Sequence, residues 1–176
     1  LAAGRNSLIT LGADAAEAAS AFEAIASVQG LSWGEKNVTA ALYLGAPIEV
    51  AGKIVVDGSL TDATSVAATY PNNATLYVAN QGILIVSQSQ GSSDTSMIAG
   101  TLSVADGSYI GVTNASEGSF KLADTITGTT EVVTDNPFIE GEISTADGTL
   151  TNTLNADSGL SALASLVIQP CLKASV

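Results

Sequence analysis

Residues 48–60 read IEVAGKIVVDGSL, where two runs with strand-like alternation flank Gly52 and the second run ends in Asp57-Gly58. An Asp-Gly pair between alternating apolar residues is a strong signal for a β-hairpin. The same pair also suits a corner at which the chain turns into the next strand of a coil without folding back. The choice between hairpin and corner decides the fold class.

A second segment repeats this pattern. Residues 50–59 read VAGKIVVDGS, and residues 98–108 read IAGTLSVADGS. Gly52 and Gly100 are 48 residues apart, which suits two coils of roughly 24 residues each. Asp147-Gly148 is a third Asp-Gly pair at a similar phase. The repetition favours corners over hairpins.

Gly52 and Asp57-Gly58 are then successive corners of one coil, and Ile54 and Val56 point inward. Short strands separated by closely spaced Gly, Asn, Asp and Ser turns predict an all-β fold, and a stacked solenoid more than a β-sandwich, which is the alternative. Residues 61–73 and 88–96 are expected as loops, and 159–168 as a short helix or a last strand. The expected strands are 7–11, 40–44, 48–50, 53–56, 59–60, 75–78, 83–86, 97–98, 101–104, 109–112, 119–122, 125–126, 131–134, 138–139, 142–144 and 149–154.

One helix is expected, within residues 13–29. Asp14 is a good N-cap, and Glu17 follows it at the spacing of a capping box. The interior is rich in alanine, the best helix former, and Gly30 is a natural stop. We expect the helix to cap the stack or to pack on its flank. Its apolar face is formed by Ala18, Phe22, Ile25 and Val28.

The composition narrows the classes of function. The chain has 176 residues, enough for one domain, 1–176, with a real core. Its net charge of −12 and its five scattered basic residues disfavour binding to nucleic acid or to an anionic membrane surface. No apolar run is long enough to insert this segment into a bilayer as a helix. The lone Cys171 permits no internal disulfide.

Three stretches resemble the passenger regions of bacterial autotransporters, the proteins of type V secretion. They are NSLITLGADAA at 6–16 with the Ala-rich helix after it, VTAALYL at 38–44, and IEVAGKIVV at 48–56. The resemblance implies a right-handed parallel β-helix of the pectin-lyase type. It also implies an extracellular place, on or shed from the outer membrane, and roles in adhesion and virulence. Without a starting Met or the family's membrane barrel, the chain is expected to be a passenger fragment.

The residue types in the chain give little support to a catalytic function. The chain contains no His, which removes the Ser-His-Asp triad, the Cys-His pair and His-ligated metals. Cys171 is expected to be a buried or incidental thiol. Glycoside hydrolysis needs two carboxylates that face each other, but Asp before Gly is also an ordinary turn residue. The carboxylates weighed for this role are Asp57, Asp106, Asp124, Asp135 and Glu131.

No cofactor and no metal site are expected. Asp62 and the pair Asp135-Asn136 are weak calcium candidates, because neither an EF-hand loop nor a Gly-rich Asp nonapeptide occurs. The expected ligand-binding residues are Trp33, Tyr70, Asn72 and Asn73, since aromatic side chains are enriched in binding surfaces. The competing interpretation of Trp33 is that it covers the apolar end where the helix meets the first coil.

The sequence thus predicts a non-catalytic structural or adhesive surface module. Its expected partners are a host glycan, a host protein or further copies of itself. The alternative is a carbohydrate-active β-helix enzyme, a polysaccharide hydrolase or lyase, or a remnant of one. Converging carboxylates would favour the enzyme, whereas carboxylates spread over turns would favour the module.

Overall fold

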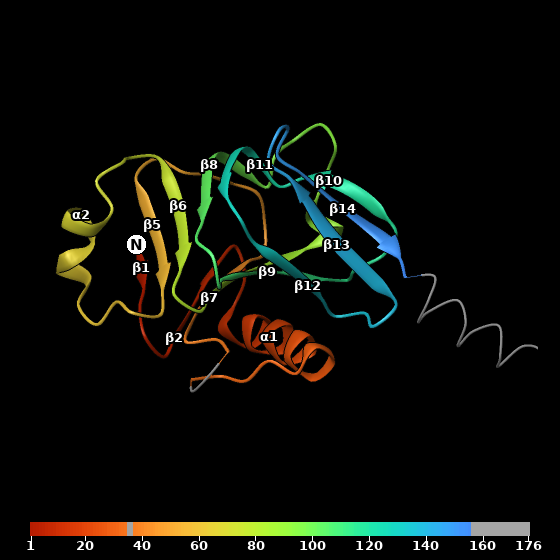
Figure 1. Cartoon of the computed structure of the whole chain (residues 1–176), viewed down its shortest axis with the longest axis horizontal. Helices are drawn as coiled ribbons and strands as arrows, with labels where there is room; N and C mark the ends of the chain where they lie inside the picture. Colours follow the sequence, from red (N-terminus) through yellow and green to blue (C-terminus); the bar gives the residue numbers. More distant parts are fainter. Residues whose placement is uncertain (35–36, 156–176) are drawn as a thin grey trace, which may run out of the picture.

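The computed structural model describes residues 1–34 and 37–155, and in this part the protein is mostly β (Figure 1). The expected all-β class is confirmed. The predicted segment at 159–168 lies outside the described residues, as does Cys171. Among the described residues, no helix has both the length and the apolar character needed to cross a bilayer.

The described strands form three sheets. Sheet A contains β1 (Ala2–Ala3), β5 (Lys53–Asp57), β6 (Thr75–Ala79), β8 (Ile98–Val104) and β11 (Ala123–Gly128), in that order, with β4 (Ile48–Glu49) paired to β8. Sheet B contains β12 (Glu131–Thr134), β9 (Tyr109–Thr113), β7 (Gly82–Ser87), β3 (Ala40–Leu44) and β2 (Ser7–Leu11). The third sheet contains β10 (Gly118–Lys121), β14 (Thr149–Leu154) and β13 (Ile139–Ser144). The helices are α1 (Ala15–Gln29) and α2 (Val66–Thr69), with 3-10 turns at Ala63–Ser65 and Gln88–Gln90.

Sheets A and B are parallel throughout, and the chain passes between them. β6, β7, β8 and β9 alternate from one sheet to the other. Parallel pairing differs from the antiparallel sheets of the alternative, a β-sandwich. The strand order in sheet A is not that of a simple coil, however. β4 pairs with β8, whereas the next strand along the chain, β5, lies between β1 and β6. The third sheet is antiparallel, so the regular β-helix is not established.

The main core lies between sheets A and B. Aligned residues on neighbouring strands form apolar ladders, such as Leu42, Leu84 and Ile110 in sheet B. Val56 is buried in this core and the partly buried Ile54 packs against it, in agreement with their predicted inward phase. Branched side chains stacked in register fill such an interior without polar atoms.

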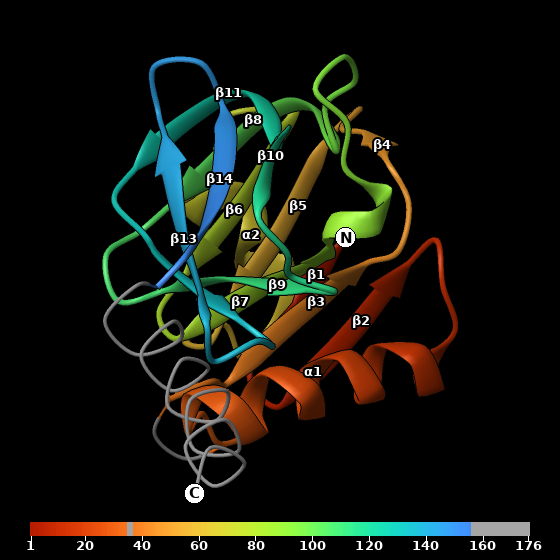
Figure 2. The same cartoon turned by 90° about the vertical axis from the view of Figure 1, so that its right-hand side faces the viewer.

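Helix α1 packs on the outer face of sheet B, so it flanks the sheet (Figure 2). The N-cap is confirmed: Asp14 Oδ1 accepts from the Glu17 amide at 2.7 Å, and Gly30 ends the helix at φ +67°. Ala18, Phe22 and Ile25 are buried. Val28, predicted as part of the same apolar face, is instead 36% exposed.

The two echoing Asp-Gly pairs are not hairpin turns. β5 pairs only with the parallel strands β1 and β6, and Asp106-Gly107 lies between β8 in sheet A and β9 in sheet B. The echo is in register: Lys53 pairs with Thr75, and Thr75 pairs with Thr101, in steps of 22 and 26 residues. The 48-residue repeat therefore spans two strand positions of sheet A.

Other details differ from the sequence prediction. Asp147-Gly148 joins β13 to the antiparallel β14, so this pair does form a hairpin. Residues 59–60 belong to a turn and are not a strand, because the Ser59 amide donates to Asp57 Oδ1 instead of to a neighbouring strand. Residues 61–73 include two short helical turns, and β8 is continuous across Gly100 at φ +152°.

Candidate functional site

A buried carboxylate lies at the end of β5, within the segment 48–60. Asp57 is 2% exposed, and its carboxylate accepts hydrogen bonds from three side chains. Oδ1 accepts from the Ser59 amide and hydroxyl, both at 2.7 Å, and from Asn80 Nδ2 at 2.9 Å. Oδ2 accepts from the Tyr70 hydroxyl. We call Asp57, Ser59, Tyr70 and Asn80 the corner cluster.

The corner cluster holds Asp57 in its charged form. Burial acts to raise the pKa of Asp57, but the hydrogen bonds from Tyr70, Ser59 and Asn80 outweigh it, and the pKa lies below its ordinary value. Burial, together with the bond to Asp57, raises the pKa of Tyr70. Tyr70 therefore stays a neutral donor and Asp57 a charged acceptor.

Local backbone geometry builds this corner. Asn80, at φ +50°, makes the turn between β6 and β7 and directs its amide back to Asp57. Gly58 is required by close packing, because a Cβ there would lie 1.7 Å from Thr39 Oγ1 and 2.1 Å from the Asn80 carbonyl oxygen. Tyr70 follows α2, and its ring lies 4.7 Å from that of Tyr77 on β6. The cluster thus fastens the segment around α2 to sheet A.

The other carboxylates weighed for catalysis, and Asp147 of the third Asp-Gly pair, differ in their partners. Asp135 accepts from the amides of Asn114 and Ala115 at 2.8 and 3.1 Å. Asp147 Oδ1 accepts from the Thr149 amide at 3.0 Å. Asp124 accepts from Ser96, whereas Asp106 and Glu131 are exposed.

The weak calcium candidates are also bound locally. Asp62 Oδ1 accepts from the Thr64 amide at 2.9 Å, and this bond lowers the Asp62 pKa. Asn136 Oδ1 accepts from the Phe138 amide at 2.9 Å. Within the described ranges, no three acidic or Cys side chains are grouped to hold a metal ion.

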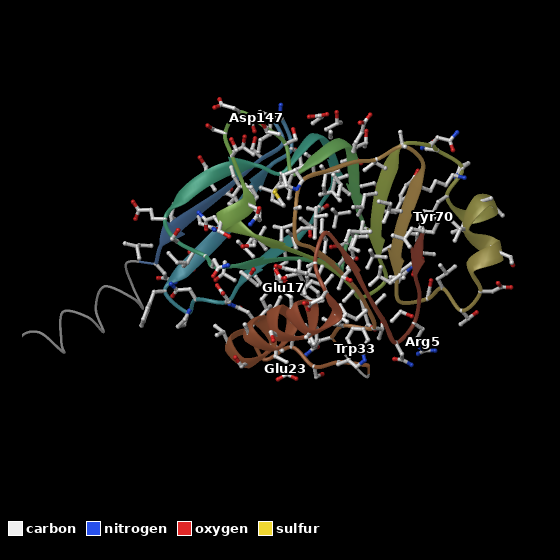
Figure 3. All side chains as sticks on the ribbon, turned by 180° about the vertical axis from the view of Figure 1, so that it is seen from behind. Arg5, Glu17, Glu23, Trp33, Tyr70 and Asp147 are labelled. Carbon is white, nitrogen blue, oxygen red and sulfur yellow. The ribbon has the colours of Figure 1, made fainter. Side chains whose placement is uncertain are left out.

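The four residues predicted to bind a ligand lie in two segments of the chain, one after α1 and one after α2. Trp33 is 37% exposed, and its ring meets Phe22 of α1 edge-on at 5.4 Å, which fits the covering role weighed from the sequence. Tyr70 lies beside α2 and belongs to the corner cluster (Figure 3). Asn72 and Asn73 are exposed next to it, and their carbonyl oxygens accept from the hydroxyls of Tyr77 and Thr75.

Comparisons of the chain with protein-family models, curated proteins and solved structures found no match.

Arg5 is a residue that the sequence reasoning passed over. It borders two surface hollows of about 420 and 400 Å³, one beside Leu60 and Asp62, the other beside Ser59 and Asn80. Its side chain has no hydrogen-bond or ion-pair partner among the described residues. The signal available in the sequence was an Arg between Gly4 and Asn6, two turn-forming residues, in a chain with only five basic residues. The structure adds that Asn6 has a φ of +63°.

Proposed function

We propose that the chain is a non-catalytic structural and adhesive module of a secreted or autotransported bacterial surface protein. The observation that carries the proposal is how its carboxylates are used. Asp14, Asp57, Asp62, Asp135 and Asp147 each accept a backbone amide in a turn or at a helix start. Side chains bound in this way shape the scaffold and are not free to act on a substrate.

The corner cluster supports the same conclusion against the alternative of a carbohydrate-active enzyme. A glycosidase needs a carboxylic acid whose pKa is raised, so that it can protonate the leaving oxygen. The pKa of Asp57 is lowered, both of its oxygens accept hydrogen bonds, and it is almost fully buried. Asp57 has neither a proton to give nor an open face toward a sugar.

The stacked sheets A and B are suited to presenting surface loops to a partner. The in-register ladders of sheets A and B favour an interpretation as windings of a parallel β-helix, in which each winding stabilises its neighbours. Such a stack is stiff and holds its loops at fixed spacing. Its surface is rich in Ser, Thr and Asn, with 12% charged residues and a net charge of −12.

From the resemblance to type V passengers, we propose that this module is located at the cell surface or outside the cell. Its partners would be host glycans, host proteins or further copies of the chain. Trp33 and the loop with Tyr70, Asn72 and Asn73 are the proposed contact regions.

Two assays on the purified chain test the proposal. Beads coated with the chain should clump with one another or bind an array of host glycans and matrix proteins. A panel of polysaccharides should show no hydrolysis or elimination. Cleavage that disappears in Asp57→Asn would contradict the proposal and support the enzyme. Asp106→Asn, which changes an exposed turn carboxylate, is the matched control.

A further inference from the structure

Strand β2 is an edge strand of unusual composition. Ser7–Leu11 reads SLITL, without charge, proline or bulge, and every residue in it is half-buried. Figure 2 shows β2 as the outermost strand of sheet B. Natural proteins shield such edges with charged residues, with proline or by covering them, because an open edge pairs with other strands.

The other described edges carry such protection. β1 has two residues and lies next to α2 (Figure 1). β12 is approached by β13 so closely that a Cβ at Gly141 would lie 2.3 Å from Val132 Cγ1. β13 carries Glu140 and Glu142, both exposed, and β11 carries the exposed Asp124. β10 has four residues and carries Lys121. Among the described edges, β2 is the long, uncharged one.

The backbone groups that β2 presents outward follow from one hydrogen bond. The Leu11 carbonyl points toward β3, where it accepts from the Gly45 amide at 2.8 Å. Successive residues of a strand direct their N–H and C=O groups to opposite sides. Leu8 and Thr10 therefore direct theirs away from β3, along the free edge.

We infer that two copies of the chain pair through β2, antiparallel, with Leu8 of each copy opposite Thr10 of the other and Ile9 on the two-fold axis. This register matches the outward donors and acceptors of Leu8 and Thr10 in hydrogen-bonded pairs. Shifting it by two residues would pair Asn6 at φ +63° or Gly12 at φ +75°, which are not extended. An isologous strand pair closes the assembly at a dimer.

Charge complementarity supports the second copy as occupant. Arg5 precedes β2 and Asp14 follows it, so an antiparallel copy brings the Arg5 end of each strand toward the Asp14 end of the other, on each side of the axis. These two pairs offset part of the repulsion between chains of charge −12, which physiological salt also screens over about 8 Å. The inference rests on the self-association part of the proposed function and assigns it a surface.

The first test removes an outward donor. Thr10→Pro deletes an N–H on the free edge and leaves the bonds to β3 intact, since proline is tolerated on edge strands. Because a single strand pair is a small interface, we expect a wild-type dimer with a Kd of roughly 10–500 μM by sedimentation equilibrium. Losing two inter-strand hydrogen bonds should raise this Kd by about tenfold or more. Thr10→Val, which keeps the donor, should dimerise like wild type.

The second test reads the register. In a Cys171→Ser background, Ile9→Cys should form a disulfide-linked dimer under mild oxidation, because residues across a non-hydrogen-bonded pair lie about 4.5 Å apart at Cα. Ser7→Cys should not, because its counterpart is displaced along the strand. Cross-linking of Ser7→Cys with none at Ile9→Cys would overturn the register.

A charge test completes the set. Arg5→Glu should weaken dimerisation severalfold more than Lys121→Glu, which changes net charge equally but lies on β10. A wild-type chain that stays monomeric at millimolar concentration, or a Thr10→Pro chain that still dimerises, would overturn this edge. Glycan or matrix-protein binding by such a monomer would leave the adhesive function standing, whereas polysaccharide cleavage would remove that function and not the dimer.

Discussion

Among single residues, Asp57 shows how hydrogen bonds stabilise a buried carboxylate in its charged form. Four donor groups surround its carboxylate, and one comes from a segment 13 residues away in sequence. Hydrogen bonds to a charged partner are stronger than neutral ones, and removing one partner leaves the other without compensation. The corner cluster therefore carries stability out of proportion to its size.

Tyr70→Phe tests this point. Loss of the hydroxyl that donates to Asp57 should lower the free energy of unfolding by about 2 kcal/mol. Tyr77→Phe is the matched control, because its hydroxyl contacts only the Asn72 carbonyl oxygen, at 3.4 Å. That control should change stability by about 0.5 kcal/mol or less. Urea denaturation followed by tryptophan fluorescence measures both, and equal losses would contradict the special role of Tyr70.

The pH dependence follows from the same carboxylate. The folded-state pKa of Asp57 lies below the value of 3.8 that applies to an unperturbed Asp, so the unfolded chain binds its proton first as pH falls. Its stabilising contribution is full above about pH 5 and is lost as pH falls through the folded-state pKa. Asp57→Asn should therefore flatten the fall in stability between about pH 5 and pH 2. Denaturation at a series of pH values measures this; an unchanged slope would contradict the assignment.

At the scale of elements, α1 is held to sheet B by apolar packing and by two polar contacts. Glu17, expected to complete a capping box, instead accepts from the Tyr43 hydroxyl at 3.0 Å. Burial, with this bond, raises the pKa of Tyr43 to about 12. Gln29 Nε2 donates to the Thr134 carbonyl oxygen at 2.8 Å. The helix is thereby fastened near both ends.

Gly111 permits the close approach between helix and sheet. A Cβ there would lie 2.6 Å from Ile25 Cδ1, so Gly111→Ala should cost about 1–2 kcal/mol through overpacking. Ile25→Val removes that methyl group and alone should cost about 1 kcal/mol. Because the smaller side chain makes room, the double variant should lose less stability than the two single variants together. Strict additivity in the denaturation experiments would show that the two residues do not meet.

At the scale of the whole molecule, charge sets the response to salt. A chain of net charge −12, whose acidic side chains share so few basic neighbours, repels itself in the folded state. Raising the salt from about 10 to 150 mM shortens the screening length from about 30 to 8 Å. The melting temperature should rise over this range, and a scan at several concentrations of NaCl measures it. A melting temperature that falls with salt would mean that attractive ion pairs dominate.

The local elements follow from the amino-acid sequence alone, because each depends on neighbours along the chain. The helix caps at Asp14 and Gly30 and strands such as 7–11, 40–44 and 131–134 are where alternation and turn chemistry placed them. The echo between 50–59 and 98–108 even predicted a shared register in sheet A, since equivalent positions of stacked strands meet the same core.

Features that depend on partners distant in the sequence emerge only in the folded chain. Three Asp-Gly pairs look alike in sequence, yet only Asp147-Gly148 closes a hairpin, because a following antiparallel strand was there to pair. The partners of Asp57 come from Tyr70 and Asn80, and no spacing rule brings those three residues together. Asp57, which the sequence predicts as a turn residue or a catalytic candidate, anchors two distant segments, because Tyr70 and Asn80 donate to its two oxygens.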